Sequence, residues 1–186
     1  MCQFITALLP TDADLKAVAA IFGKHKVGFK SVTNPHLLAQ VTPGDVYILT
    51  TRSRCDCGTP LGSLAEGKQP KQPRVDNEVG KLRKQGWSES KIERWLEQKG
   101  QTEEKQEREQ EVYVENATRR LEHWIQFLSD LLRSGHTSRV SLLLLWNGVQ
   151  DGRIPLEGEE KVPLANLNAD LLLRMKENVV YTFTSR

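Results

Sequence analysis

The feature that most restricts the fold is a central stretch that no hydrophobic core can use. Residues 103–111 read Glu-Glu-Lys-Gln-Glu-Arg-Glu-Gln-Glu, without a single apolar side chain. A helix that is polar all round cannot be buried, so this stretch must face solvent or another charged surface. The core must therefore come from the two ends of the chain. We expect a sheet domain in two parts, residues 1–66 and 112–186, with a linker and helical arm inserted at residues 67–111.

The first part predicts a strand, a helix and two further strands. An apolar run stops at a proline, a stripe of apolar residues at helical spacing follows, and extended segments come next. These elements are expected at residues 2–9, 12–25, 27–32 and 45–51, with 37–41 continuing the extended path.

The second part predicts a helix that can cover a sheet, followed by an apolar strand, a short helix and a last strand. A long helix is expected to begin in the arm and to continue into this part, where its residues from Ala117 to Leu131 form an apolar seven-residue repeat. The elements are expected at residues 103–133, 139–146, 168–175 and 179–183. Strand–helix–strand–strand–helix–strand is the order of a ferredoxin-like sheet. We therefore expect an α+β fold: a mainly antiparallel sheet of about five strands, with helices 12–25 and 112–134 on one face and a charged helical arm inserted.

The three cysteines are predicted to meet at one end of this sheet. With a right-handed crossover, the third strand lies between the first two and antiparallel to both, so its end faces the start of the first strand. Cys2 opens the first strand, and Cys55 and Cys57 follow the third. The first helix returns to the same end with His25. Three thiolates and an imidazole suit zinc, so these four residues are predicted zinc ligands, with His36 as an alternative to His25. The other interpretation is that the cysteines are small buried hydrophobes.

A catalytic role for Cys2 is a separate hypothesis. Met1 precedes a small residue, so aminopeptidase can remove it and leave Cys2 at the N-terminus, where the α-amine takes the thiol proton. This Met-Cys start resembles that of glutamine amidotransferases of the N-terminal nucleophile class, in which glycine normally follows the cysteine; Gln3 stands here. The resemblance covers two residues and implies an amide hydrolase or transferase with Cys2 as nucleophile.

Within the arm, a helical stretch is expected from about residue 75, broken at Gly86 and ended at Gly100. The helical arm is the predicted binding surface. Trp87, Lys91, Arg94 and Trp95 lie close together in the sequence, and tryptophan and arginine are frequent interface anchors. Residues 66–100 carry nine basic and six acidic side chains, whereas residues 101–135 carry five basic and eight acidic. The alternative is therefore a charged hairpin whose two halves pair with each other.

Charge and composition favour a protein partner over nucleic acid or membrane. The net charge is only +2, whereas nucleic-acid binders usually show a basic excess. Apolar runs such as residues 142–146 are too short to cross a membrane, and no secretory signal is evident. No nucleotide-binding loop or hydrolase motif is present. We expect a small cytoplasmic protein-binding or regulatory protein, for example a toxin-neutralising immunity protein, acting through its arm. Self-association and a zinc-stabilised nucleic-acid module are alternatives.

Overall fold

The computed structural model describes residues 2–52, 54–57, 59–62, 75–146 and 152–185. The chain divides into two compact units. The first, here called the sheet unit, combines Met1–Glu66 with Thr118–Arg186, and the second, the arm unit, is Gly67–Ala117. Among the described residues, no helix combines the length and the apolar character needed to cross a membrane.

A six-stranded open sheet, mixed but mostly antiparallel, forms the centre of the sheet unit, in the order β2-β3-β1-β4-β6-β5. Its strands are β1 (Gln3–Leu9), β2 (Lys30–Ser31), β3 (Val46–Leu49), β4 (Arg139–Trp146), β5 (Gly158–Pro163) and β6 (Val179–Thr184). Strand β3 lies between β1 and β2 and is antiparallel to both, as the cysteine argument requires. The predicted α+β class is confirmed, whereas the full ferredoxin-like topology stays a prediction.

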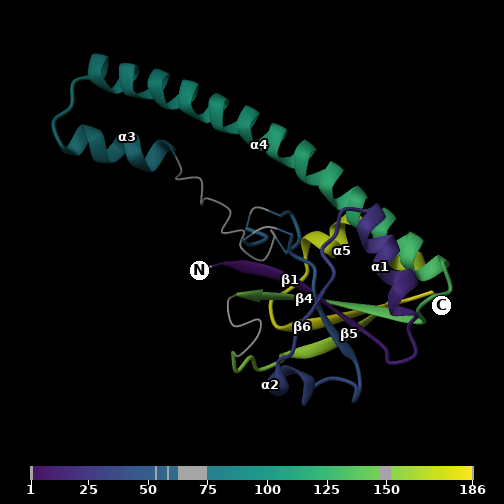
Figure 1. Ribbon diagram of the computed structural model, residues 1–186. Helices are drawn as coiled ribbons and strands as arrows, with labels where there is room; N and C mark the ends of the chain where they lie inside the picture. The colour runs from purple at the N-terminus through teal and green to yellow at the C-terminus, as the bar shows by residue number, and fades with distance from the viewer. Residues whose placement is uncertain (1, 53, 58, 63–74, 147–151, 186) are drawn as a thin grey trace. The chain divides into compact units, whose positions relative to one another are not determined.

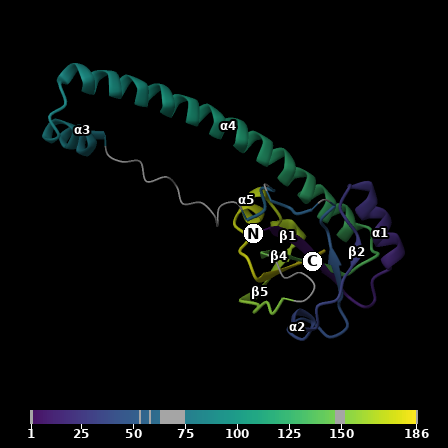
Figure 2. The ribbon, with the colours of Figure 1, turned by 60° about the vertical axis from the view of Figure 1, so that its left-hand side comes forward.

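Helices cover one face of the sheet, and a single-turn helix lies on the other (Figures 1 and 2). Those on the first face are α1 (Leu15–Lys24), α5 (Ala169–Leu173) and the C-terminal end of α4 (Glu89–Arg133). The helix on the second face is α2 (Pro35–Leu38). The sequence predicts the first layer correctly and does not predict the second.

Both faces of the sheet are buried because successive residues of β1 point to opposite sides. Ile5 and Leu9 pack in the core under α1 and α4, which includes the fully buried Phe22 and Leu128. Leu8 packs on the other side in a smaller core that also contains Leu37 and Tyr47. Strand β1, which Cys2 directly precedes, is thus packed on both of its faces.

Two elements differ from the sequence expectations. Leu37 and Leu38, expected to be extended, lie in α2 instead, because the Asn34 side chain accepts hydrogen bonds from the backbone N–H groups of His36 and Leu37, at 3.1 and 3.0 Å. Strand β5 adds a sixth, parallel edge strand that the sequence does not predict.

The arm unit contains helix α3 (Val75–Lys84) and the N-terminal part of α4. The predicted break at Gly86 is confirmed: this residue has a φ of 79°, a conformation that glycine adopts without strain. The predicted break at Gly100 is wrong, because α4 continues through it. A glycine inside a helix costs only about 1 kcal/mol, which a long helix can tolerate.

Candidate metal centre

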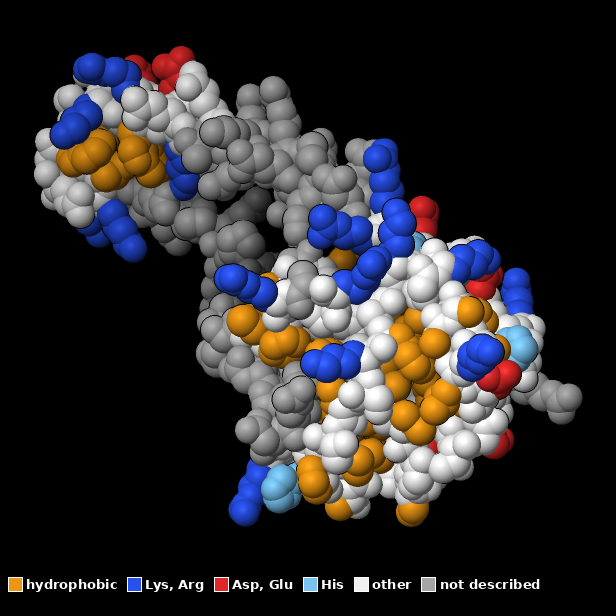
Figure 3. Space-filling view, in the orientation of Figure 1, with side chains coloured by type: hydrophobic (Ala, Val, Ile, Leu, Met, Phe, Trp, Pro, Cys, Tyr) orange, Lys and Arg blue, Asp and Glu red, His pale blue; other side chains and the backbone are white. Residues whose placement is uncertain are grey.

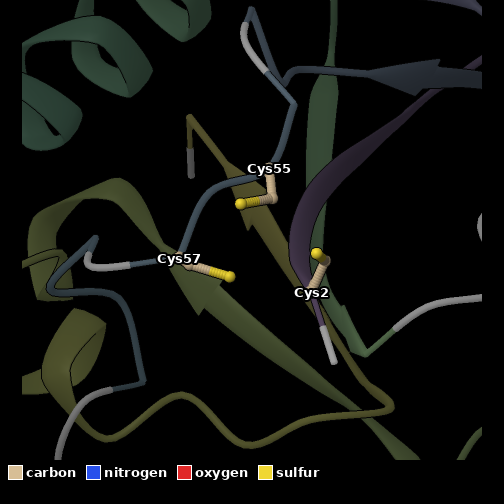
Figure 4. Close-up of side chains that lie close together, drawn as sticks. All are labelled: Cys2, Cys55 and Cys57. Atoms are coloured by element: carbon tan, nitrogen blue, oxygen red, sulfur yellow. The ribbon is translucent and has the colours of Figure 1, made fainter.

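The structure brings the three cysteine sulfurs together. Cys2 lies directly before β1, and Cys55 and Cys57 lie in the segment that follows β3. The three Sγ atoms are all within 4.8 Å of one another, and Figure 4 shows them at the corners of a small triangle. All three cysteines of the chain are among the described residues, and none forms a disulfide. This separation could be bridged by one metal ion.

Asp56 holds the two segments in place. Its backbone N–H donates to the carbonyl oxygen of Gln3 at 2.8 Å, and its Oδ2 accepts from the N–H of Ile5 at 2.8 Å. The N–H of Gln3 points to the Sγ of Cys57 at 3.2 Å. The segment after β3 therefore runs along the start of β1 as an additional backbone partner, which sets the cysteines on either side of Asp56 next to Cys2.

The ligand set consists of sulfur atoms. The Asp56 carboxylate also accepts a hydrogen bond from the Thr51 hydroxyl, so it is turned toward the protein. Burial raises the pKa of Asp56, although the hydrogen bonds from Thr51 and Ile5 act in the opposite direction. Cys2 and Cys57 are exposed and Cys55 is half-buried, so a cation can enter from solvent. Thiolates select zinc and other soft cations.

His25, the predicted fourth ligand, lies outside this group. In the described part of the chain, the group holds the three cysteines and no histidine. The Nε2 of His25 lies 2.9 Å from Oδ2 of Asp130, and only 8% of its side chain is exposed. Hydrogen bonds from Lys24 and then His25 lower the pKa of Asp130 to about 2. His25 thus has a carboxylate partner in place of the metal. His36, the alternative, lies in α2, on the other face of the sheet from α1 and α4.

The predicted partner-binding residues lie in the arm unit, in the first turns of α4 and just before it. Lys91 places its Nζ 4.0 Å from the centre of the Trp87 ring, and Lys99 places its Nζ 4.9 Å from that of Trp95. Trp87 lies just before α4 and the other three lie within it; the four recur at every fourth position, so tryptophan and lysine alternate along this stretch. Arg94 turns its Nε to the carbonyl oxygen of Ser90, at 3.3 Å. Both tryptophans are half-buried.

Sequence reasoning missed a pocket beside the cysteine-bearing segment. Its lining includes Lys26, Arg52, Thr59 and His123. Arg52 and Thr59 flank the cysteines in the sequence, a signal that could have drawn attention to them. Nothing in the sequence connects them to His123, whose Nε2 donates to the carbonyl oxygen of His25 at 2.7 Å across 98 residues of chain.

No protein-family model, no curated protein and no solved structure matches this chain. Functional inference therefore rests on the geometry of the chain's own residues.

Proposed function

We propose that this protein binds zinc through Cys2, Cys55 and Cys57, and that the ion fastens the segment after β3 to the start of β1. The observation that supports this is the approach of all three sulfurs to within 4.8 Å. Cysteine occurs nowhere else in the chain. Structural zinc sites gain folding free energy by joining segments that are far apart in sequence, and Cys2 is more than fifty residues away from Cys55 and Cys57.

The fourth position of a tetrahedral zinc would be open to solvent. Closed structural sites have four protein ligands, whereas sites with three keep a place for water or another small ligand. The exposure of Cys2 and Cys57 agrees with the second arrangement. We therefore include a water molecule or an external thiol as the fourth ligand in this proposal.

Zinc binding is tested by measuring the metal content of the purified protein and its zinc affinity in a competition titration. We expect one zinc per chain, and Cys57→Ser should weaken binding at least about a hundredfold, because even partners that only orient a ligand cost ten- to a hundredfold.

The matched control is His25→Gln. This variant should bind zinc as tightly as the wild type, because His25 lies against Asp130 rather than in the sulfur group. Loss of zinc in His25→Gln would restore the ligand set predicted from the sequence. Equal zinc content in wild type and Cys57→Ser would refute the three-cysteine site.

We also propose that the arm unit binds an acidic surface of another protein. The alternation of Trp87, Lys91, Trp95 and Lys99 supports it. Tryptophan supplies apolar contact area, and each lysine above a ring supplies a positive charge that an acidic partner would complement.

This proposal is tested by affinity capture followed by titration with the purified partner. The full chain should capture a partner whose binding weakens with added salt, and Trp87→Ala with Trp95→Ala should weaken it about tenfold or more. Cys57→Ser, which leaves the arm unit unchanged, is the control. Equal binding by the tryptophan variant, or no captured partner, would contradict the proposal.

The remaining functional hypotheses stay predictions from the sequence. They are an amide hydrolase or transferase using Cys2, a zinc-stabilised nucleic-acid module, an immunity-type activity and self-association.

A further inference from the structure

The pocket beside the cysteine-bearing segment has about 220 Å³ of space and lies within the sheet unit. Three parts of the chain form it: Lys26 and Val27 just after α1, four residues after β3 (Thr50, Arg52, Asp56 and Thr59), and α4 at His123 and Trp124. It is separate from the sulfur triangle, although Asp56 contributes to both.

Positive charge lines this pocket. Lys26 and Arg52 contribute an ammonium and a guanidinium group, and both side chains are exposed to solvent. The Nη1 of Arg52 lies 3.4 Å from the carbonyl oxygen of Lys26, so the two residues are held beside each other. On the face of the sheet unit drawn in Figure 3, Lys and Arg side chains gather near α4 and the end of α1, with few acidic side chains among them.

Thr59 adds a polar group that has no partner of its own. Its hydroxyl oxygen is buried and forms no hydrogen bond to any of the described residues. A buried hydroxyl without a partner is unfavourable, and most such groups in proteins are satisfied by a protein group, water or ligand. Because Thr59 lines the pocket, a bound molecule with acceptor oxygens would supply that partner.

The carboxylate of Asp56 also belongs to the lining, but it does not oppose the positive charges of Lys26 and Arg52 strongly. Oδ2 of Asp56 accepts hydrogen bonds from the Ile5 N–H and the Thr51 hydroxyl, so it faces β1 and its own segment. Lys26, Arg52 and Thr59 of the lining offer donors to a ligand. Guanidinium and ammonium groups with a nearby hydroxyl are typical recognition elements for phosphate oxygens.

We propose that this pocket binds a phosphate group, with Arg52 and Lys26 neutralising its charge and the Thr59 hydroxyl donating to one of its oxygens. Two ligands would present the same doubly charged tetrahedral oxyanion to the pocket: free phosphate and the terminal phosphate of an ester. The pocket holds it without any contribution from a metal ion.

The test is calorimetric titration of the full chain with inorganic phosphate and, separately, with phenyl phosphate, at constant ionic strength. Saturable one-to-one binding is expected. Arg52→Gln should weaken it about tenfold or more, since charge-assisted hydrogen bonds are the strong ones, and Thr59→Val should weaken it severalfold. Thr59→Val removes a buried hydroxyl without a partner, so it should fold normally. Tighter binding of phenyl phosphate would identify an ester as the preferred source, and tighter binding of inorganic phosphate the free ion.

The matched control is Lys30→Gln, which removes one positive charge from an exposed residue outside the pocket. It should leave phosphate affinity unchanged. Equal weakening by Lys30→Gln and Arg52→Gln would show general charge attraction and overturn the proposal, as would the absence of saturable binding. Titrations with Cys57→Ser and with chelator present should give the wild-type affinity. Loss of binding there would show that phosphate binding depends on the metal ion, directly or through the segment that the ion holds, and would overturn a pocket that binds without a metal; the zinc proposal is judged separately by metal content.

Discussion

Replacing Arg139 with alanine is expected to lower the free energy of unfolding by about 3–5 kcal/mol, measured by urea denaturation. Arg139 opens β4 and donates from Nη1 and Nη2 to the two carboxylate oxygens of Asp45, at 3.0 and 2.7 Å. Only 3% of the Asp45 side chain is exposed, against 23% for Arg139. Without the guanidinium, a negative charge stays buried with no cation, and this uncompensated burial is the main cost.

A double substitution separates the cost of leaving the Asp45 carboxylate buried without a cation from the net contribution of the ion pair to stability. Asp45→Asn combined with Arg139→Met removes both charges and keeps most of the volume, so the double variant should lose much less stability than Arg139→Ala. A loss below about 1 kcal/mol for Arg139→Ala would mean that the pair behaves as an exposed salt bridge. The hydrogen bonds with Asp45 also raise the pKa of Arg139, and an arginine side chain stays protonated in proteins.

The sheet could be predicted where each element carries its own pattern. Strand β4 is apolar throughout and α1 has a helical stripe, so their type follows from local sequence. Strand β5 could not be found in this way. Its sequence is Gly-Glu-Glu-Lys-Val-Pro, with Val162 the one fully buried side chain, and it is extended because it pairs with β6. Helix α2 carries a start signal in Asn34 and Pro35, but a single turn is too short to show periodicity.

In the candidate site, too, the part that follows from strand order could be predicted, and the part that depends on single side-chain contacts could not. The meeting of Cys2 with Cys55 and Cys57 follows from strand order, which the sequence predicts, because the end of β3 must lie beside the start of β1. The fate of His25 depends on one side-chain partner, Asp130, which lies 105 residues away. No pattern in the sequence predicts the pairing of His25 with Asp130. For the same reason the sequence does not predict the pocket lined by Arg52 and Thr59, which is assembled from three distant segments.

The junction of these segments depends on a close backbone approach at Gly28, which donates its N–H to the carbonyl oxygen of Thr50 at 2.7 Å. A Cβ on Gly28 would lie 2.6 Å from that oxygen and 2.8 Å from the carbonyl oxygen of Thr51. Both contacts are with backbone atoms, which cannot rotate away as a flexible side chain would. Accommodating the methyl group therefore requires the segment after β3 to move as a whole.

Gly28→Ala is expected to lower the free energy of unfolding by about 3 kcal/mol, because overpacking costs up to that amount and the Gly28–Thr50 hydrogen bond is lengthened as well. Gly23→Ala is the control with the opposite sign. Gly23 lies inside α1 with no atom within 4 Å of an added Cβ, so alanine there should raise stability by up to about 1 kcal/mol. Urea denaturation of both variants measures the two changes in stability.

Because Thr50 and Thr51 lead directly to the segment that carries Cys55 and Cys57, Gly28→Ala should also weaken zinc binding while Gly23→Ala leaves it unchanged. A Gly28→Ala protein with wild-type stability would show that the segment after β3 moves freely against the chain beyond α1, and the positions of both proposed sites would then lose their structural basis.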